Sequence, residues 1–124
     1  MTSAKGPAGS GIVLHGGAER LATRLVNADR LPTTISWYRV ATGGHCSYHV
    51  HRGKDECWLI VAGKGRARVA ETEYEVAAGD FILTHEGTPH ALFNTGSEEL
   101  VFVNIVFPTG TGAISSTEIP EQGP

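Results

Sequence analysis

The stretch of sequence that decides the fold reads HVHRGKDE and runs from His49 to Glu56. Residues two apart on an extended strand point to the same side, so His49 and His51 present two imidazoles to one volume. The carboxylate of Glu56, at the start of the next strand, is able to join them. Two imidazoles and a carboxylate that converge in this way suit a divalent transition metal. The pair of histidines alone would be a weak signal, because such short motifs often occur without a metal.

A second set of spaced residues follows downstream and strengthens the metal interpretation. From Gly79 the chain continues through five residues to His85, and then to Gly87, His90 and Asn94. Together the two stretches resemble the paired signatures of the cupin family, small β-barrels whose motifs are written G-x5-H-x-H-x3,4-E-x6-G and G-x5-P-x-G-x2-H-x3-N.

The resemblance to the cupins covers the chain continuously from Gly43 to Asn94, and every motif position matches except one, because His85 stands where the family has proline. Cupins commonly bind one metal through three histidines and one glutamate. The matching positions in this chain are His49, His51, Glu56 and His90. The resemblance therefore implies one divalent transition metal per chain, with Fe, Mn, Ni, Co and Zn as candidates. The alternative is a metal-free cupin that keeps these residues as polar filling, which the cost of burying four unpaired ionisable groups disfavours.

Length and composition predict one globular domain. The chain has 124 residues, of which 40% are hydrophobic and 19% charged, enough to bury a core without disulfides or structural metals. We expect a flexible N-terminal segment over residues 1–11, a barrel domain over residues 12–108 and a C-terminal tail over residues 109–124.

Charge and hydropathy exclude two classes of partner. The formal net charge is -3, and ten lysines and arginines do not form the clustered basic surface that phosphate binding needs, so nucleic acid is not an expected partner. Residues 1–11 lack the apolar region of a secretory signal, and no apolar segment is long enough to cross a bilayer. We expect a cytoplasmic protein without a membrane partner.

The rhythm of short apolar runs and Gly-containing turns predicts eight or nine strands, a pattern typical of an all-β sandwich or barrel. The cupin resemblance points to the same fold, a single jelly-roll barrel. The expected strands include Ile35–Val40, His45–His51, Glu56–Ala62, Phe81–Thr84, His90–Asn94 and Leu100–Phe107. The segment Ala18–Leu25 has a weak helical pattern, and we expect at most one helical turn there.

Alternation along the strands predicts the surroundings of the metal. If the ligands face inward, His45 and Ser47 on the first ligand strand also face inward, and so do Trp58 and Ile60 on the second. Leu92 joins these four from the strand that begins at His90. The cavity is thus expected to have an aromatic wall and polar groups near the metal.

The same alternation turns the two cysteines, Cys46 and Cys57, away from the ligands. A disulfide then has no evident geometry, and reduced thiols are expected.

Arg39 and His85 are the candidate catalytic residues, and each has two interpretations. Arg39 and Tyr38 alternate, so only one of them enters the cavity; Arg39 inside would offer a fork for a substrate carboxylate, and outside it would be a surface charge. His85 is either a turn residue in place of proline, or an acid/base at the barrel mouth.

The run Leu100–Phe107 is apolar on both sides except at Asn104, which predicts that both faces of this strand are covered. A second subunit is the natural cover, so we expect a homodimer. The alternative is that the tail, residues 109–124, folds back over the strand.

Three histidines and one carboxylate occupy four positions of an octahedral ion and leave two for exogenous ligands. The cupin resemblance implies a wide choice of chemistry, including dioxygenases, decarboxylases, isomerases, lyases and binding modules. We expect a metal-dependent small-molecule enzyme, with oxidoreductase chemistry of the dioxygenase type ahead of lyase, isomerase or decarboxylase chemistry. A non-catalytic small-ligand-binding protein is the rival class.

Overall fold

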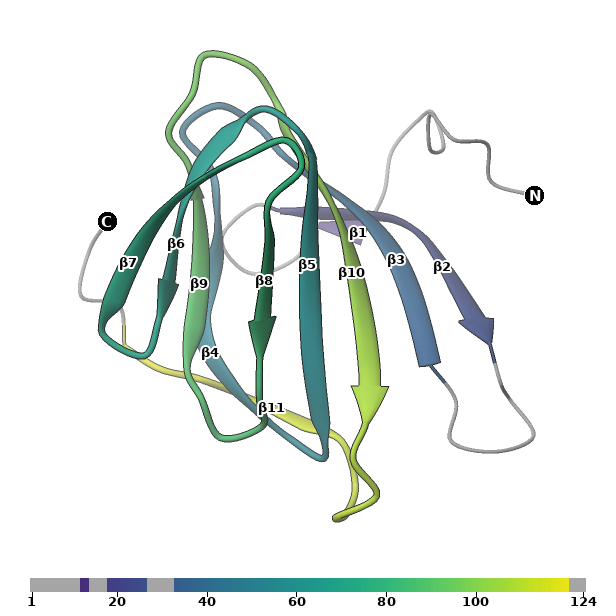
Figure 1. Ribbon diagram of the computed structural model, residues 1–124. Coiled ribbons are helices and arrows are strands. Elements are labelled where there is room, and N and C mark those ends of the chain that lie inside the picture. Colours follow the sequence, from purple (N-terminus) through teal and green to yellow (C-terminus); the bar gives the residue numbers. More distant parts are fainter. Residues whose placement is uncertain (1–11, 14–17, 27–32, 121–124) are drawn as a thin grey trace.

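The computed structural model describes residues 12–13, 18–26 and 33–120, and every regular element in these residues is a strand (Figure 1). The strands are β1 (Ile12–Val13), β2 (Glu19–Val26), β3 (Thr33–Val40), β4 (His45–Arg52), β5 (Lys54–Ala62), β6 (Lys64–Val69), β7 (Thr72–Ala77), β8 (Phe81–Thr84), β9 (His90–Asn94), β10 (Leu100–Pro108) and β11 (Ser115–Glu118). Among the described residues there is accordingly no helix of the length and hydrophobicity that crossing a membrane would take.

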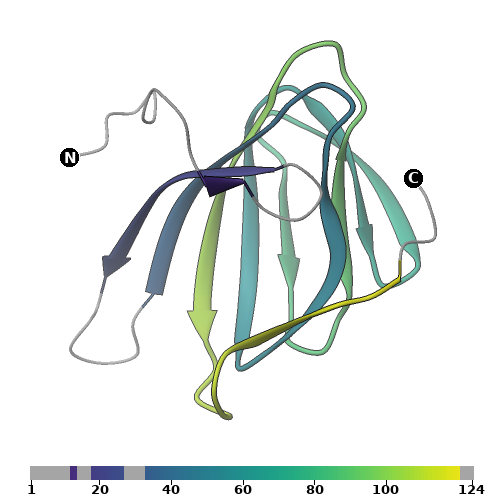
Figure 2. The same cartoon turned by 180° about the vertical axis from the view of Figure 1, so that it is seen from behind.

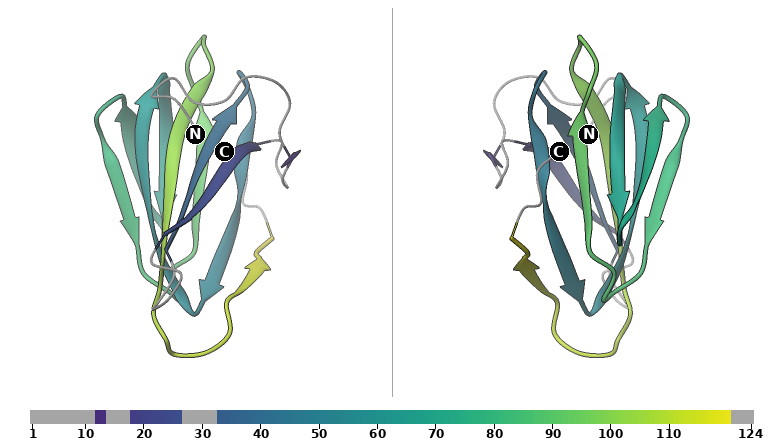
Figure 3. Two further views of the ribbon diagram at one scale, coloured as in Figure 1. Left: turned by 90° about the vertical axis from the view of Figure 1, so that its right-hand side faces the viewer. Right: turned by 90° about the vertical axis from the view of Figure 1, so that its left-hand side faces the viewer.

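The strands form two antiparallel sheets that lie face to face as two layers (Figure 3). The larger sheet has the order β1-β2-β3-β10-β5-β8, and the smaller has the order β11-β4-β9-β6-β7. Strands adjacent in space are often distant in sequence, as with β10 between β3 and β5, and this is the jelly-roll arrangement expected from the sequence. The all-β prediction is confirmed.

The hydrophobic core fills the space between the two sheets. On β10 the inward positions Leu100, Phe102, Asn104 and Val106 are buried, whereas the residues that alternate with them, Val101, Val103 and Ile105, are only half-buried. Ile60 from β5 and Leu92 from β9 belong to the same buried cluster as Leu100 and Phe102. Burying each of these large side chains stabilises the fold by about 1.5–3 kcal/mol. The packed core therefore holds β4, β5 and β9, which carry the predicted ligands, in fixed positions.

The helical turn expected within Ala18–Leu25 is wrong, because residues 19–26 form strand β2. β2 pairs antiparallel with β3 along its whole length, with Glu19 opposite Arg39 and Val26 opposite Thr33. The helical pattern was weak and local, and the backbone partners offered by β3 outweigh it.

The segment after residue 108, expected as a tail, contributes a strand to the smaller sheet (Figure 2). β11 pairs with β4, so that Ser116 lies opposite His51 and Glu118 opposite His49. β11 forms the edge of the smaller sheet beside β4 and does not pair with β10.

The glycine that ends the first motif has a steric reason to be there. Gly63 connects β5 to β6 with φ +89°, and a Cβ at this position would lie 2.5 Å from the carbonyl oxygen of Glu99. Gly43 also has a positive φ, of +80°, but a Cβ there would meet nothing within 4 Å. The motif thus uses Gly63 for close backbone approach and Gly43 for its turn conformation alone.

Candidate metal centre

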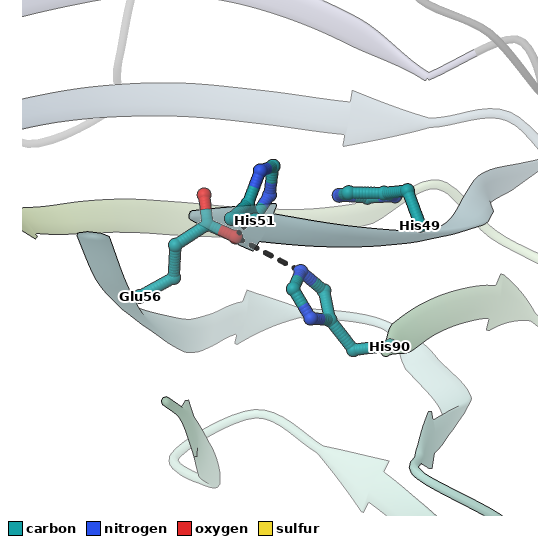
Figure 4. A group of neighbouring side chains, drawn as sticks. All are labelled: His49, His51, Glu56 and His90. Carbon is teal, nitrogen blue, oxygen red and sulfur yellow. Dashed lines mark hydrogen bonds and ion pairs between the residues drawn. The ribbon is translucent and has the colours of Figure 1, made fainter. Parts of the chain in front are cut away.

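The four predicted ligands lie together inside the barrel (Figure 4). His49 and His51 come from β4, Glu56 from β5 and His90 from β9. Each offers one ligand atom, and these atoms all lie within 4.8 Å of one another. Small side-chain movements would bring all four ligand atoms onto one divalent ion.

A β-bulge in β4 aims the first two histidines. His45 lies opposite Phe93, Cys46 opposite Leu92 and His49 opposite His90. From Cys46 to His49 the chain advances three residues, whereas the partner strand advances only two, from Leu92 to His90. The extra residue reverses the alternation of side chains between Cys46 and His49. Both of these residues consequently face the interior, and His49 is brought to His90 on the neighbouring strand.

Two backbone carbonyls orient His49 and His90. The Nδ1 atom of His49 lies 2.6 Å from the carbonyl oxygen of Ser47, and Nδ1 of His90 lies 3.0 Å from that of Thr88. A carbonyl oxygen can only accept, so Nδ1 carries the hydrogen in both rings and donates it. The Nε2 atoms are thereby left for the centre of the cluster, which is how metal-binding histidines are commonly held.

The remaining contacts within the cluster fit a cation. Nε2 of His90 lies 2.9 Å from Oε1 of Glu56, and since Nδ1 already donates elsewhere, this contact needs a second ring proton or a positive ion. Nε2 of His51 also lies 2.9 Å from Oε1 of Glu56, but without hydrogen-bond geometry. Both ring nitrogens of His51 are buried, and neither finds a hydrogen-bond partner in the described part of the chain. A divalent ion would satisfy these atoms together.

The surroundings of Glu56 and His49 hold these two ligands in the protonation states that a metal requires. Burial alone would raise the pKa of Glu56, but the imidazoles of His51 and His90 and the ammonium of Lys54 hold it well below its ordinary value. Burial and the neighbouring His90 lower the pKa of His49 to about 4. At neutral pH, Glu56 is therefore a carboxylate and His49 a neutral imidazole.

Two residues that sequence reasoning did not select hold the second oxygen of Glu56. The Nδ2 atom of Asn104 donates to Oε2 at 2.9 Å, and Nζ of Lys54 lies 3.4 Å from the same oxygen. Oε1 is thus left to face the imidazoles. Asn104 did carry a signal, as the single polar residue in an apolar strand, and Lys54 has the same parity as Glu56 on β5.

Three of the four ligands, His49, His51 and Glu56, line a cavity of about 320 Å³, and His90 is buried behind them. The other residues that line it are Ala18, Arg20, Tyr38, Cys46, Ser47, Lys54, Trp58, Phe102, Asn104, Ser116 and Glu118. Ser47 and Trp58 therefore lie where the strand alternation placed them. Ile60 and Leu92 also face the interior, but they are buried in the core and do not line the cavity.

His45, expected in the cavity, does not line it. Its ring stacks on Phe93, with centroids 5.4 Å apart. His45 precedes the bulge in β4, and the extra residue therefore turns it to the opposite face of the sheet from His49. Cys46 takes the interior position instead. The prediction that Cys46 faces away from the ligands is therefore wrong, because Cys46 lines the cavity beside them. Cys46 and Cys57 are both free thiols.

The two candidate catalytic residues lie outside the cavity lining. Tyr38, not Arg39, enters it, while the guanidinium of Arg39 pairs with Glu19 at 3.3 Å. The side chain of His85 is 70% exposed and lies 3.4 Å from Asp55. The amide of Thr88 donates to the carbonyl of His85 at 3.1 Å, so His85 opens a turn, as its first interpretation had it.

The fold and the site together place this chain in one class, the small β-barrels with three histidines and one glutamate arranged in the interior as a possible metal site. A family model described as "Cupin domain" matches residues 36–106, more than half of the chain, and the chain belongs to this family. It is also similar to an oxalate-binding protein of Thermotoga maritima, with 28% identity over 68 residues. That match covers 55% of this chain and 56% of the relative, so the chain spans about half the length of the curated protein it matches.

Solved structures show the same fold. A double-stranded β-helix protein of Klebsiella pneumoniae superposes with a TM-score of 0.67 at 21% identity, covering 86% of this chain and 89% of the other. A protein of Thermotoga maritima described as a predicted oxalate decarboxylase gives a TM-score of 0.61 at 21% identity, with 74% and 79% covered. At this level of identity the likeness concerns the fold alone.

Proposed function

We propose that this protein is a metal-dependent small-molecule enzyme with one divalent transition metal per chain, held by His49, His51, Glu56 and His90. The observation that carries the proposal is the buried imidazole of His51, which has no hydrogen-bond partner among the described residues and lies beside the carboxylate of Glu56 on the cavity wall. Leaving such a group unsatisfied is costly unless a cation binds it.

The leading reaction that we propose is an oxygen-dependent oxidation of the dioxygenase type. When bound, a metal with four protein ligands supplies two open positions, enough for a substrate and dioxygen side by side. Asn104 and Lys54 hold one oxygen of Glu56, so that its carboxylate uses the other and does not take a further position. Trp58 and Phe102 give the cavity an apolar wall that limits water beside the ligands.

Two other functions use the same residues. The first is a lyase, isomerase or decarboxylase reaction without oxygen, and the predicted oxalate decarboxylase among the structural neighbours supports its decarboxylase form. The second is non-catalytic binding of a small acid, which the name of the curated relative supports. Arg39 and His85 remain proposals as catalytic groups, and their positions outside the cavity lining make them weaker candidates than Tyr38 or Lys54.

Metal analysis followed by oxygen uptake tests the proposal. Protein expressed with each candidate metal should carry close to one ion per chain, and His51→Ala should lose it. His85→Ala is the matched control, because that side chain is exposed, and it should keep the metal. Oxygen consumption across a panel of enolisable and catecholic acids supports the dioxygenase assignment, whereas turnover without oxygen replaces it with the lyase or isomerase one. Folded protein that binds no metal refutes the proposal as a whole.

We also propose a homodimer that uses the outer face of the larger sheet. Leu59 and Phe81 lie opposite each other on β5 and β8, with Leu83 on the same face, and all three are exposed. Phe107 of β10 is exposed as well, at 42%. Exposed apolar side chains on three neighbouring strands support a second copy of the chain as their cover.

A further inference from the structure

One charged side chain in the cavity has no part in the candidate metal centre. Arg20 lies on β2, is half-buried and lines the cavity. Two other cations are engaged elsewhere, since Lys54 contacts Glu56 and Arg39 pairs with Glu19. Within the described ranges of the chain, Arg20 has no carboxylate as an ion-pair partner.

The neighbours of Arg20 point it toward a ligand. Arg20 lies opposite Tyr38 in the β2–β3 register, and Tyr38 enters the cavity from the next strand and stacks on Phe102 with centroids 4.9 Å apart. Burial raises the pKa of the Tyr38 phenol, which therefore stays neutral and offers a hydrogen rather than a charge. The guanidinium is consequently the group at this wall that can neutralise an anion.

The charges of the cavity also favour an anionic ligand. The ionised side chains that line it are Arg20, Lys54, Glu56 and Glu118, two cations and two carboxylates that cancel. Burial raises the pKa of the Cys46 thiol to about 12, so it adds no charge. A bound divalent ion would then leave two positive charges that no other described lining residue offsets, which attracts a negatively charged ligand.

We infer, resting on the function proposed above, that the cavity takes a small organic acid whose carboxylate pairs with Arg20 while an oxygen at its other end reaches the metal. The planar guanidinium provides two parallel N–H donors that match a carboxylate. The body of the ligand lies against Trp58 and Phe102. A cavity of about 320 Å³ is at the small end of ligand sites, which suits one ring or a short chain.

The inference is tested with two ligands of nearly the same shape, 3,4-dihydroxybenzoate and 3,4-dihydroxybenzamide, which differ in the carboxylate that the acid alone carries. The adjacent hydroxyls of both can chelate a metal, but only the acid presents a carboxylate at the opposite end. Metal-loaded wild-type protein should bind the acid about tenfold more tightly than the amide. Arg20→Gln should abolish this preference while binding the amide within about twofold of wild type, and Arg20→Lys should restore part of it.

Arg68→Gln is the matched control, because Arg68 on β6 pairs with Glu73 at 2.9 Å and does not line the cavity. It should keep the full preference. The inference is overturned if the wild type does not discriminate between acid and amide, or if Arg20→Gln discriminates as well as the wild type does.

The outcome is separable from that of the proposed function. Metal content is measured on every variant, and protein that takes up no metal refutes the metal-dependent enzyme. Calorimetric titration of the metal-free protein with the same two ligands still reads the contribution of Arg20, and weak binding of the acid that is lost in Arg20→Gln supports it. Equal heats for wild type and variant would count against it.

Discussion

Replacing Asn104 with leucine should weaken metal binding without unfolding the protein. Asn104 is buried, with 6% of its surface exposed, and its Nδ2 donates to Oε2 of Glu56 at 2.9 Å. Leucine has a similar volume but no donor, so the carboxylate loses a partner and becomes free to turn. Its other oxygen is then no longer aimed at the imidazoles of His51 and His90.

The magnitude follows from the type of bond that is lost. A hydrogen bond to a charged group contributes about 1.5–3 kcal/mol. If this loss falls on the metal-bound state, in which Glu56 must hold one orientation, the dissociation constant rises about 10- to 100-fold, at ~1.4 kcal/mol for each factor of ten. Residues that orient a metal ligand from behind typically have effects of the same size. Lys54, 3.4 Å from the same oxygen, keeps the loss from being larger.

Competition with a chromophoric chelator, using Co(II) or Zn(II), measures the dissociation constant, and circular dichroism confirms that the variant is folded. Asn94→Leu is the control, because Asn94 is also a buried asparagine but donates to the carbonyls of Val40 and Glu98. It should lower stability and leave metal affinity within a few-fold of wild type. Folded Asn104→Leu protein with wild-type affinity would refute the reasoning, as would an equal loss of affinity in Asn94→Leu.

Three further predictions concern the scaffold and the metal. Removing the metal with a chelator should lower the thermal midpoint, since an ion at a thousandfold excess over its dissociation constant stabilises by about 4 kcal/mol; calorimetric midpoints that do not change would contradict the site. Gly63→Ala should lower the free energy of unfolding in urea by more than Gly43→Ala, which costs about 1 kcal/mol, because only at Gly63 does a Cβ meet the carbonyl of Glu99. Leu83→Lys should give a monomer in sedimentation while Tyr74→Lys, at a similarly exposed position on the other sheet, should not, and a wild type that is already monomeric would end the dimer proposal.

His49, His51 and Glu56 could be predicted from their local spacing, whereas His90 was implied by the resemblance to the cupin motifs. His49 and His51 lie on one side of the bulge in β4, so a spacing of two residues is enough to bring both imidazoles to one face. Glu56 follows after a short connection, and His90 pairs directly with His49 across two adjacent strands. Each of these relations survives small errors in the strand boundaries.

The cavity wall was less predictable, because its parity depends on backbone irregularity. His45 and Cys46 precede the bulge, and one extra residue exchanges the faces that they occupy. The bulge includes Ser47 and Tyr48, and no glycine marks it in the sequence. The prediction therefore assumed regular alternation of side chains through this segment. Ser47 lines the cavity as expected because it lies within the irregular segment itself, close to the ligands.

Arg20 and Asn104 illustrate a limit of a different kind, because their roles depend on which strands become neighbours. Arg20 reaches the cavity only because β2 is a strand that pairs with β3 and brings it opposite Tyr38. The same pairing places Glu19 opposite Arg39, which gives Arg39 a partner outside the cavity and leaves the inward position to Tyr38. A single pairing of strands thus decides which arginine lies in the cavity. Because the local sequence of residues 18–25 favoured a helical turn, the place of Arg20 in the cavity wall could be found only from the assembled sheet.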